Sequence, residues 1–292
     1  MPHKLLFMKH AFLIMAHNNF EILNALIKVL DDENNDIYIH IDKKSKSFHI
    51  NKVNRATLIF TNKRYDIRWA DESQIRLELY IFQEAYKHGP YMYYHLLSGV
   101  DMPLKTNKYI HEFCQMNYGM EFVGFVPFDQ MDKEVFKVLN YHFFTGHLKD
   151  KTNFWTRLHW KIIDFQLKHG ISRKPIHEYR KGSNWVSITN NFVKYLLDRK
   201  QSIIKEYKYT FGCDELFVQT ELWNSPFRNN IYDLGDEFHG SLRKIDWDRG
   251  CPYTWKNSDF DELMNSEALF ARKFDTKHFD IVERIAENLN NG

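Results

Sequence analysis

The first half of the chain alternates short apolar runs with amphipathic runs, and this alternation constrains the fold more than any other feature. HAFLIMA, residues 10–16, has the length of a buried strand, and DIYIHIDKKS, residues 36–45, begins with another. Between them, apolar residues from Phe20 to Leu30 recur at helical spacing. The same order continues through residues 57–126 and ends in MEFVGFV, residues 120–126, as a further expected strand. Successive βαβ units produce this pattern, so the sequence predicts an α/β fold with a mostly parallel central sheet flanked by helices.

In such sheets ligands bind beyond the carboxyl ends of the strands, so the residues that follow each strand are candidates for a site. These are His17, Asp42 and the segment 98–101. Gly99 is expected to supply an unusual backbone angle there, and the Asp101 side chain to cap the turn or to bind a ligand. No Gly-x-Gly-x-x-Gly or Gly-x-x-x-x-Gly-Lys sequence occurs. The chain therefore predicts a nucleotide-binding fold without those glycine loops.

Composition narrows the class of protein. A chain of 292 residues with 43% hydrophobic residues can bury a large core, so we expect one large domain. The formal charge of +2 gives no general case for binding nucleic acid. The three cysteines, Cys114, Cys213 and Cys251, form neither a disulfide framework nor a C-x-x-C zinc pattern. No secretory signal or membrane span is visible, and we expect a soluble, cytoplasmic protein, peripheral at most to the inner membrane face.

Residues 147–181 form a basic, aromatic segment with nine Lys or Arg against three acidic residues. Within it Trp155, Leu158, Ile162 and Phe165 recur at three- and four-residue spacing, which predicts an amphipathic helix. We expect this helix to dock on the core. The alternative is contact with an anionic membrane surface or a glycan. Nucleic acid is not expected as a partner, because no recognised binding motif accompanies the charge.

Six motifs occur in an order that resembles the core-2/I-branching β-1,6-N-acetylglucosaminyltransferase family, which is related to peptide O-xylosyltransferases. They are IMAHNNFEILNALI, IHIDKKS, SGVDMPLKTN, GSNWVSIT, CDELFVQTEL and LFARKFD, and the resemblance covers roughly residues 10–275. The resemblance implies a GT-A type fold, a UDP-sugar donor, a glycan acceptor and an inverting transfer that needs no metal or other cofactor. It predicts a single domain over residues 1–292, with a nucleotide-sugar half at 10–126 and an acceptor-side, catalytic half at 127–292.

We further expect a bacterial member of the family that builds surface polysaccharide. N-acetylglucosamine is the expected sugar. A xylosyltransferase of the same family is the alternative, and so is a module that binds glycan without catalysis.

The candidate catalytic residue is Glu215 in CDELFVQTEL. An inverting transfer needs one carboxylate to take the proton of the acceptor hydroxyl as that hydroxyl attacks. On residues alone, Glu215 is equally a first-turn acid after an Asp214 N-cap. The resemblance implies that Glu215 is the base and that Asp214 orients its loop on the acceptor side.

Donor and acceptor contacts follow from the same resemblance. Asp42 is expected to hold the uridine, with Met15 and His17 beside the base. Asp101 is expected to contact a hydroxyl of the donor sugar. Trp185 in GSNWVSIT and Trp247 are candidates to stack on an acceptor sugar, although a tryptophan in an apolar run is by default a core residue.

The UDP leaving group needs positive charge beside its diphosphate. Lys273 in LFARKFD matches a lysine that the family uses for this, and Arg249 is the candidate arginine, with Arg243 as the fallback. The alternative is a metal-dependent transferase in which Asp246 and Asp248, in IDWDRG, hold a divalent cation.

Overall fold

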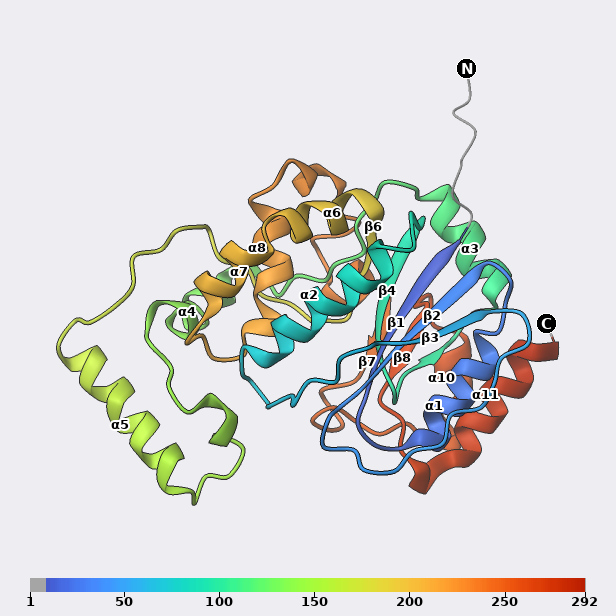
Figure 1. Ribbon diagram of the computed structural model, residues 1–292, viewed down its shortest axis with the longest axis horizontal. Helices are drawn as coiled ribbons and strands as arrows, with labels where there is room; N and C mark the ends of the chain where they lie inside the picture. The colour runs from blue at the N-terminus through green and yellow to red at the C-terminus, as the bar shows by residue number, and fades with distance from the viewer. Residues whose placement is uncertain (1–8, 292) are drawn as a thin grey trace.

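The computed structural model describes residues 9–291, and its centre is a five-stranded sheet in the order β3-β2-β1-β4-β6 (Figure 1). Strand β1 pairs in parallel with β2 and β4, and β2 pairs in parallel with β3. The last strand, β6, runs antiparallel to β4. The bounds are β1 His10–Ala16, β2 Asn35–Ile41, β3 Thr57–Phe60, β4 Tyr93–Ser98 and β6 Ser187–Thr189. The predicted α/β fold with a mostly parallel sheet is confirmed.

Helices cover both faces of this sheet, because the side chains that its central strands direct to either face are apolar. Phe12 and Ile14 of β1 face a core that contains α1 and α11, whereas Leu13 faces a second core formed with α2, α6 and α8. The helices are α1 Phe20–Val29, α2 Ser73–Tyr86, α3 Asn107–Met116, α4 Phe136–Leu139, α5 Phe154–Lys168, α6 Asn190–Asp198, α7 Lys200–Tyr207, α8 Phe217–Trp223, α9 Glu237–Ser241, α10 Phe260–Met264 and α11 Phe279–Asn291. Within residues 9–291, none of them combines the length and apolar character needed to cross a bilayer.

A second, three-stranded sheet joins the two halves of the chain. Its order is β5-β8-β7, with β5 at Met102–Pro103, β8 at Phe270–Arg272 and β7 at Arg243–Ile245. Strand β8 runs antiparallel to β5 and parallel to β7. This small sheet therefore places the end of β8 beside the loop that follows β4.

Two local expectations are corrected. MEFVGFV, residues 120–126, is not a regular strand, because Glu121 and Phe122 make only isolated bridges, to Ile231 and Ser187. Gly99 has no positive φ; instead, a Cβ on it would lie 2.7 Å from Cβ of Ala16. Glycine is needed there because the loop after β4 passes against the end of β1.

Candidate functional site

A cavity of about 760 Å³ opens at the carboxyl ends of β1, β2 and β4. Met15, His17 and Asp42 line it, and so does Ser98 at the end of β4. The edge of the sheet that the sequence singled out is therefore hollow, and it gathers three of the predicted donor-side residues.

Asp42 is held in place by the loops around it. Its Oδ1 accepts a hydrogen bond of 2.8 Å from the Lys44 amide, and its Oδ2 accepts one of 3.2 Å from the Ile67 amide. The Lys44 ammonium lies 3.5 Å from the same carboxylate. Beside it, burial lowers the pKa of His17, which favours a neutral imidazole although Asp42 opposes the shift.

The cavity carries more positive than negative charge. Lys44, Arg68, Lys149 and Arg272 line it, against two acidic residues, Asp42 and Asp66. A concave surface with an excess of cations attracts a phosphorylated ligand.

A second hollow of about 440 Å³ continues from the first, because both are lined by Gln74, Asn184, Trp185 and Arg272. We call the two together the cleft. Its second part is lined by three further predicted residues, Asp214, Glu215 and Trp247. Residues from both halves of the chain therefore build one continuous cleft.

Glu215 sits in a short 3-10 turn, Cys213–Glu215, that follows Gly212. Gly212 has φ of 59°, the left-handed region that glycine adopts without strain, and this bend sets the direction of the turn. The Glu215 side chain is 44% exposed, and its carboxylate lies 3.5 Å from the ammonium of Lys181. It is thus a solvent-accessible carboxylate at the cleft with one cation beside it.

Asp214 differs from its neighbour because it is buried. Its Oδ2 accepts a hydrogen bond of 2.6 Å from Nε2 of the Gln74 side chain. Burial raises the pKa of the Asp214 carboxyl to about 7, and the charge of Glu215 adds to the rise. The pair therefore joins a group that titrates near neutrality to an exposed carboxylate.

Glu78 lies behind this pair and was missed by sequence reasoning. It is completely buried, and its carboxyl accepts a hydrogen bond of 3.4 Å from the amide of Asn184. Burial raises the pKa of Glu78 well above its usual range, with a further rise from Asp214. A signal was present, since Glu78 interrupts the apolar stripe of Ile75 and Phe82 on α2.

Arg272 stands in the wall shared by both parts of the cleft. Its guanidinium lies 4.2 Å over the ring of Trp185, and its Nη1 lies 3.7 Å from Oδ1 of Asp101. Within residues 9–291, this Nη1 has no hydrogen-bond partner. Asp101 itself accepts hydrogen bonds from the amide and hydroxyl of Ser98 and does not line the cleft. It therefore contacts two residues of the lining, Ser98 and Arg272, without lining the cleft itself.

The three cations that the sequence assigned to the diphosphate are not in the cleft lining. Arg243 is buried in the core, where it donates to the carbonyl oxygens of Ser241 and Val186. Arg249 is an exposed side chain that pairs with Asp246, Asp259 and Glu262, and Lys273 follows the end of β8. The cation that β8 brings to the cleft is Arg272.

Asp246 and Asp248 also lie outside the lining. Asp246 accepts hydrogen bonds from the backbone amides of Asp248 and Arg249, and its second oxygen pairs with the Arg249 side chain. The Asp246 carboxylate therefore stabilises the turn formed by residues 246–249.

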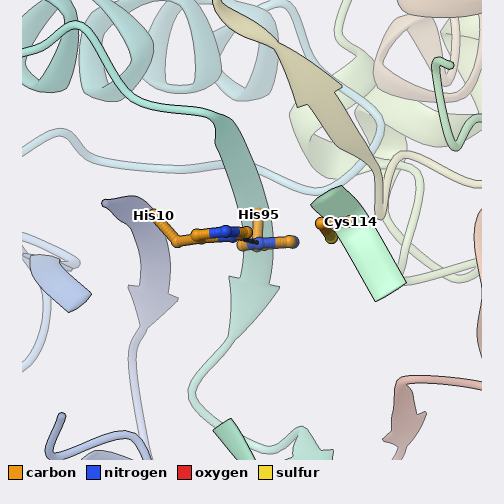
Figure 2. A group of neighbouring side chains, drawn as sticks. All are labelled: His10, His95 and Cys114. Carbon is orange, nitrogen blue, oxygen red and sulfur yellow. Dashed lines mark hydrogen bonds between the residues drawn. The ribbon is translucent and has the colours of Figure 1, made fainter. Parts of the chain in front are cut away.

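A buried group of His10, His95 and Cys114 lies in the sheet and α3 (Figure 2). Nδ1 of His10 lies 2.9 Å from Nε2 of His95, whose Nδ1 lies 2.7 Å from the Ser187 hydroxyl. Arg243 donates to that hydroxyl. Because an arginine only donates, Ser187 can donate to His95, and His95 in turn to His10. The facing nitrogens are thus used in a hydrogen-bonded chain that crosses the core.

A mostly parallel sheet with a cationic cavity at its strand ends, and acidic side chains in the adjoining hollow, defines an α/β protein with a ligand site at the position usual for such sheets. Comparison with known proteins identifies the family. The family model described as Core-2/I-Branching enzyme matches residues 10–267. The chain belongs to this family of glycosyltransferases, and the GT-A type fold expected from the sequence is confirmed with it.

The curated relatives carry xylosyltransferase names. Xylosyltransferase 2 of Canis lupus familiaris is 24% identical over 303 residues, which cover 91% of this chain and 32% of the relative. Xylosyltransferase 1 of Homo sapiens is 24% identical over 289 residues, covering 91% and 28%. The chain thus spans about a third of the length of the curated relatives it matches. Among solved structures, the apo form of mouse xyloside xylosyltransferase 1 aligns with a TM-score of 0.35 and 12% identity, covering 92% of this chain and 98% of that one.

Proposed function

We propose that the protein transfers a sugar from a UDP-sugar to a hydroxyl of a glycan acceptor, with inversion at the anomeric carbon and with Glu215 as general base. The observation that carries this proposal is that Glu215 and Arg272 line the same part of the cleft. A base for the incoming hydroxyl and a cation for the departing diphosphate are the two charges that a direct displacement requires.

The donor occupies the larger part of the cleft in this proposal. Asp42, fixed by two backbone amides, accepts hydrogen bonds from the uridine, with Met15 and His17 beside it. Arg272 takes the role that the sequence gave to Lys273, Arg249 and Arg243. Two unit charges about 4 Å apart interact by roughly 4 kcal/mol at an effective dielectric near 20, so one well-placed guanidinium contributes substantially. Trp185 and Trp247 contact the acceptor sugar.

We propose that no divalent cation takes part. The support is that Asp246 uses its carboxylate on Arg249 and on backbone amides, outside the cleft lining. Arg272 supplies the positive charge that a bound metal ion supplies in metal-dependent enzymes.

N-acetylglucosamine is the sugar we propose, as the resemblance implies. UDP-xylose is the second candidate, favoured by the xylosyltransferase names of the relatives. A cytoplasmic, bacterial role in surface polysaccharide stays a prediction.

The test is UDP release from a panel of UDP-sugars, with a mixed glycan acceptor, in the presence and absence of EDTA. We expect turnover of one donor, UDP-N-acetylglucosamine, at the same rate in EDTA. Turnover of UDP-xylose alone would identify xylose as the transferred sugar and would leave the proposed mechanism unchanged. Loss of activity in EDTA, restored by manganese, would contradict the metal-independent step. UDP binding without transfer or hydrolysis across the panel would indicate a non-catalytic glycan-binding module.

A further inference from the structure

Helix α5 attaches to the rest of the protein through a polar face. The residues it buries are Thr156, His159, Ile163 and Gln166, only one of which is apolar. Thr156 donates to the carbonyl oxygens of His147 and Asp150, and Gln166 exchanges two hydrogen bonds with the backbone of Tyr141. Hydrogen bonds therefore form much of the attachment of this helix. In Figure 1, α5 stands apart from the sheet and its covering helices.

The apolar side chains of α5 face outward instead. Phe154 is 66% exposed, Phe165 is 56% exposed and Trp155 is 42% exposed, while Leu158 and Ile162 are half-buried. The expected docking of this stripe on the core is therefore corrected. Leaving a large apolar side chain in water forgoes about 1.5–3 kcal/mol, so a strip of them favours an apolar partner.

A cationic strip runs beside the apolar one. Arg157, Lys161 and Lys168 are separated by four and seven residues, so they share one side of the helix, and all three are exposed. Within residues 9–291 none of them forms an ion pair, and Asp164 is the one acidic side chain among them. Exposed Lys149, Lys151 and Lys174 extend the positive charge into the flanking loops.

We propose that α5 docks on an anionic lipid bilayer surface. A helix with apolar and cationic strips side by side lies in the plane of the membrane interface, with its aromatic side chains among the acyl chains and its lysines at the headgroups. We call Phe154–Lys168 and the exposed apolar residues beyond it, Ile171 and Ile176, the docking segment.

Charge and composition favour this partner over two others. In a symmetric dimer through α5, each cationic strip would meet the same helix of the other copy, which carries three basic residues against one acidic residue, and the two would repel. Single-stranded nucleic acid stacks on aromatic rings, but it makes no specific contact with exposed aliphatic side chains such as Ile171 and Ile176. A bilayer uses both the aliphatic and the cationic groups.

The docking segment is connected to the cleft. Gly146, His147 and Lys149 line the larger cavity, and Thr156 of α5 binds the backbone of His147. A helix resting on the bilayer therefore holds one wall of the cavity near the membrane surface. Docking itself does not depend on the proposed transferase activity, and its test uses binding alone.

The test is co-sedimentation of the full chain with vesicles of phosphatidylcholine, alone or mixed equally with phosphatidylglycerol. We expect binding to the anionic vesicles only, weakened by salt. Two double variants probe the strips: Phe154→Ser with Phe165→Ser, and Lys161→Glu with Lys168→Glu. Each should reduce binding tenfold or more. A control pair on α3, Met116→Ser with Lys108→Glu, removes the same kinds of exposed side chain elsewhere and should bind as the wild type does.

The melting temperature of each variant checks that its fold is intact. Equal binding of wild type and both strip variants would overturn the proposal, and so would no binding to either vesicle. A single-stranded oligonucleotide bound in place of vesicles would identify nucleic acid as the partner. Concentration-dependent dimers, lost on the Phe154→Ser and Phe165→Ser changes and seen without vesicle binding, would identify a second copy of the chain.

Discussion

The Arg272 guanidinium rests 4.2 Å over the Trp185 ring, and both residues line the two parts of the cleft. This stacking fixes a cation whose Nη1 is free of hydrogen-bond partners within residues 9–291. A planar, preorganised guanidinium is suited to bidentate contact with a diphosphate.

We therefore expect Arg272→Ala to weaken UDP binding by about 10- to 100-fold, in line with the usual worth of hydrogen bonds to charged groups. Arg272→Lys should recover only part of the affinity, because an ammonium keeps the charge and loses the planar fork. Isothermal titration with UDP measures both. The matched control is Arg249→Gln, which removes an arginine outside the cleft lining and should leave the UDP affinity unchanged. A larger effect at Arg249 than at Arg272 would restore the original sequence assignment.

The pH dependence of turnover is expected to follow the protonation of Asp214. Asp214 has a pKa of about 7, because burial and the adjacent Glu215 both disfavour its charge. Above that pH, Asp214 is ionised, and its negative charge beside the reaction centre stabilises the positive charge that develops in the transition state. The profile of kcat/KM should therefore rise through a limb near pH 7. Asp214→Asn should lose this limb, and the exposed Asp248→Asn should keep it. Superimposable profiles for Asp214→Asn and wild type would contradict the assignment.

The third prediction concerns stability. Glu121 is buried and binds the amide and hydroxyl of Thr189, and burial raises its pKa from the ordinary 4.5 to about 8. The folded state thus holds a proton that the unfolded chain releases. The resulting stabilisation is complete below about pH 4.5 and is lost as the pH rises toward 8. Glu121→Gln, a neutral isostere, lacks this dependence.

Urea unfolding of both proteins at pH 5.5 and pH 8 provides the measurement. The free energy of unfolding of the wild type should fall relative to the variant by roughly 1–3 kcal/mol between these two pH values. A constant difference between the two proteins would show that Glu121 is ionised throughout.

Part of the lining of the larger cavity could be predicted from local sequence. His17 and Asp42 were predicted from their positions after strands, and the structure places both in the cavity lining. The reason is general, since parallel strands end at the same edge and the following residues must meet there. That part of the site needs only the strand pattern.

The choice between Arg272 and Lys273 does not follow from sequence. Which of these two neighbours lines the cleft depends on how β8 pairs with β5 and β7. Those partners are separated from β8 by long stretches of chain. Only the assembled small sheet shows that Arg272 is the residue that lines the cleft.

Helix α5 illustrates a different limit. Periodicity shows that Trp155, Leu158, Ile162 and Phe165 share a side of a helix, and the helix forms as predicted. It does not show whether that side turns inward. In this structure Thr156 and Gln166 donate hydrogen bonds to backbone carbonyl oxygens of the neighbouring loops. The polar side of the helix therefore faces the protein, and the apolar side faces solvent.

The role of Glu215 is the central claim, and one comparison tests it most directly. Steady-state UDP release is measured for wild type, Glu215→Gln and the control Glu237→Gln, a second carboxyl of the same hollow, with UDP affinity determined for each. The account predicts that Glu215→Gln lowers kcat by about 100- to 10,000-fold and leaves UDP affinity unchanged. Glu237→Gln should keep most of the activity. Wild-type turnover by Glu215→Gln would contradict the account.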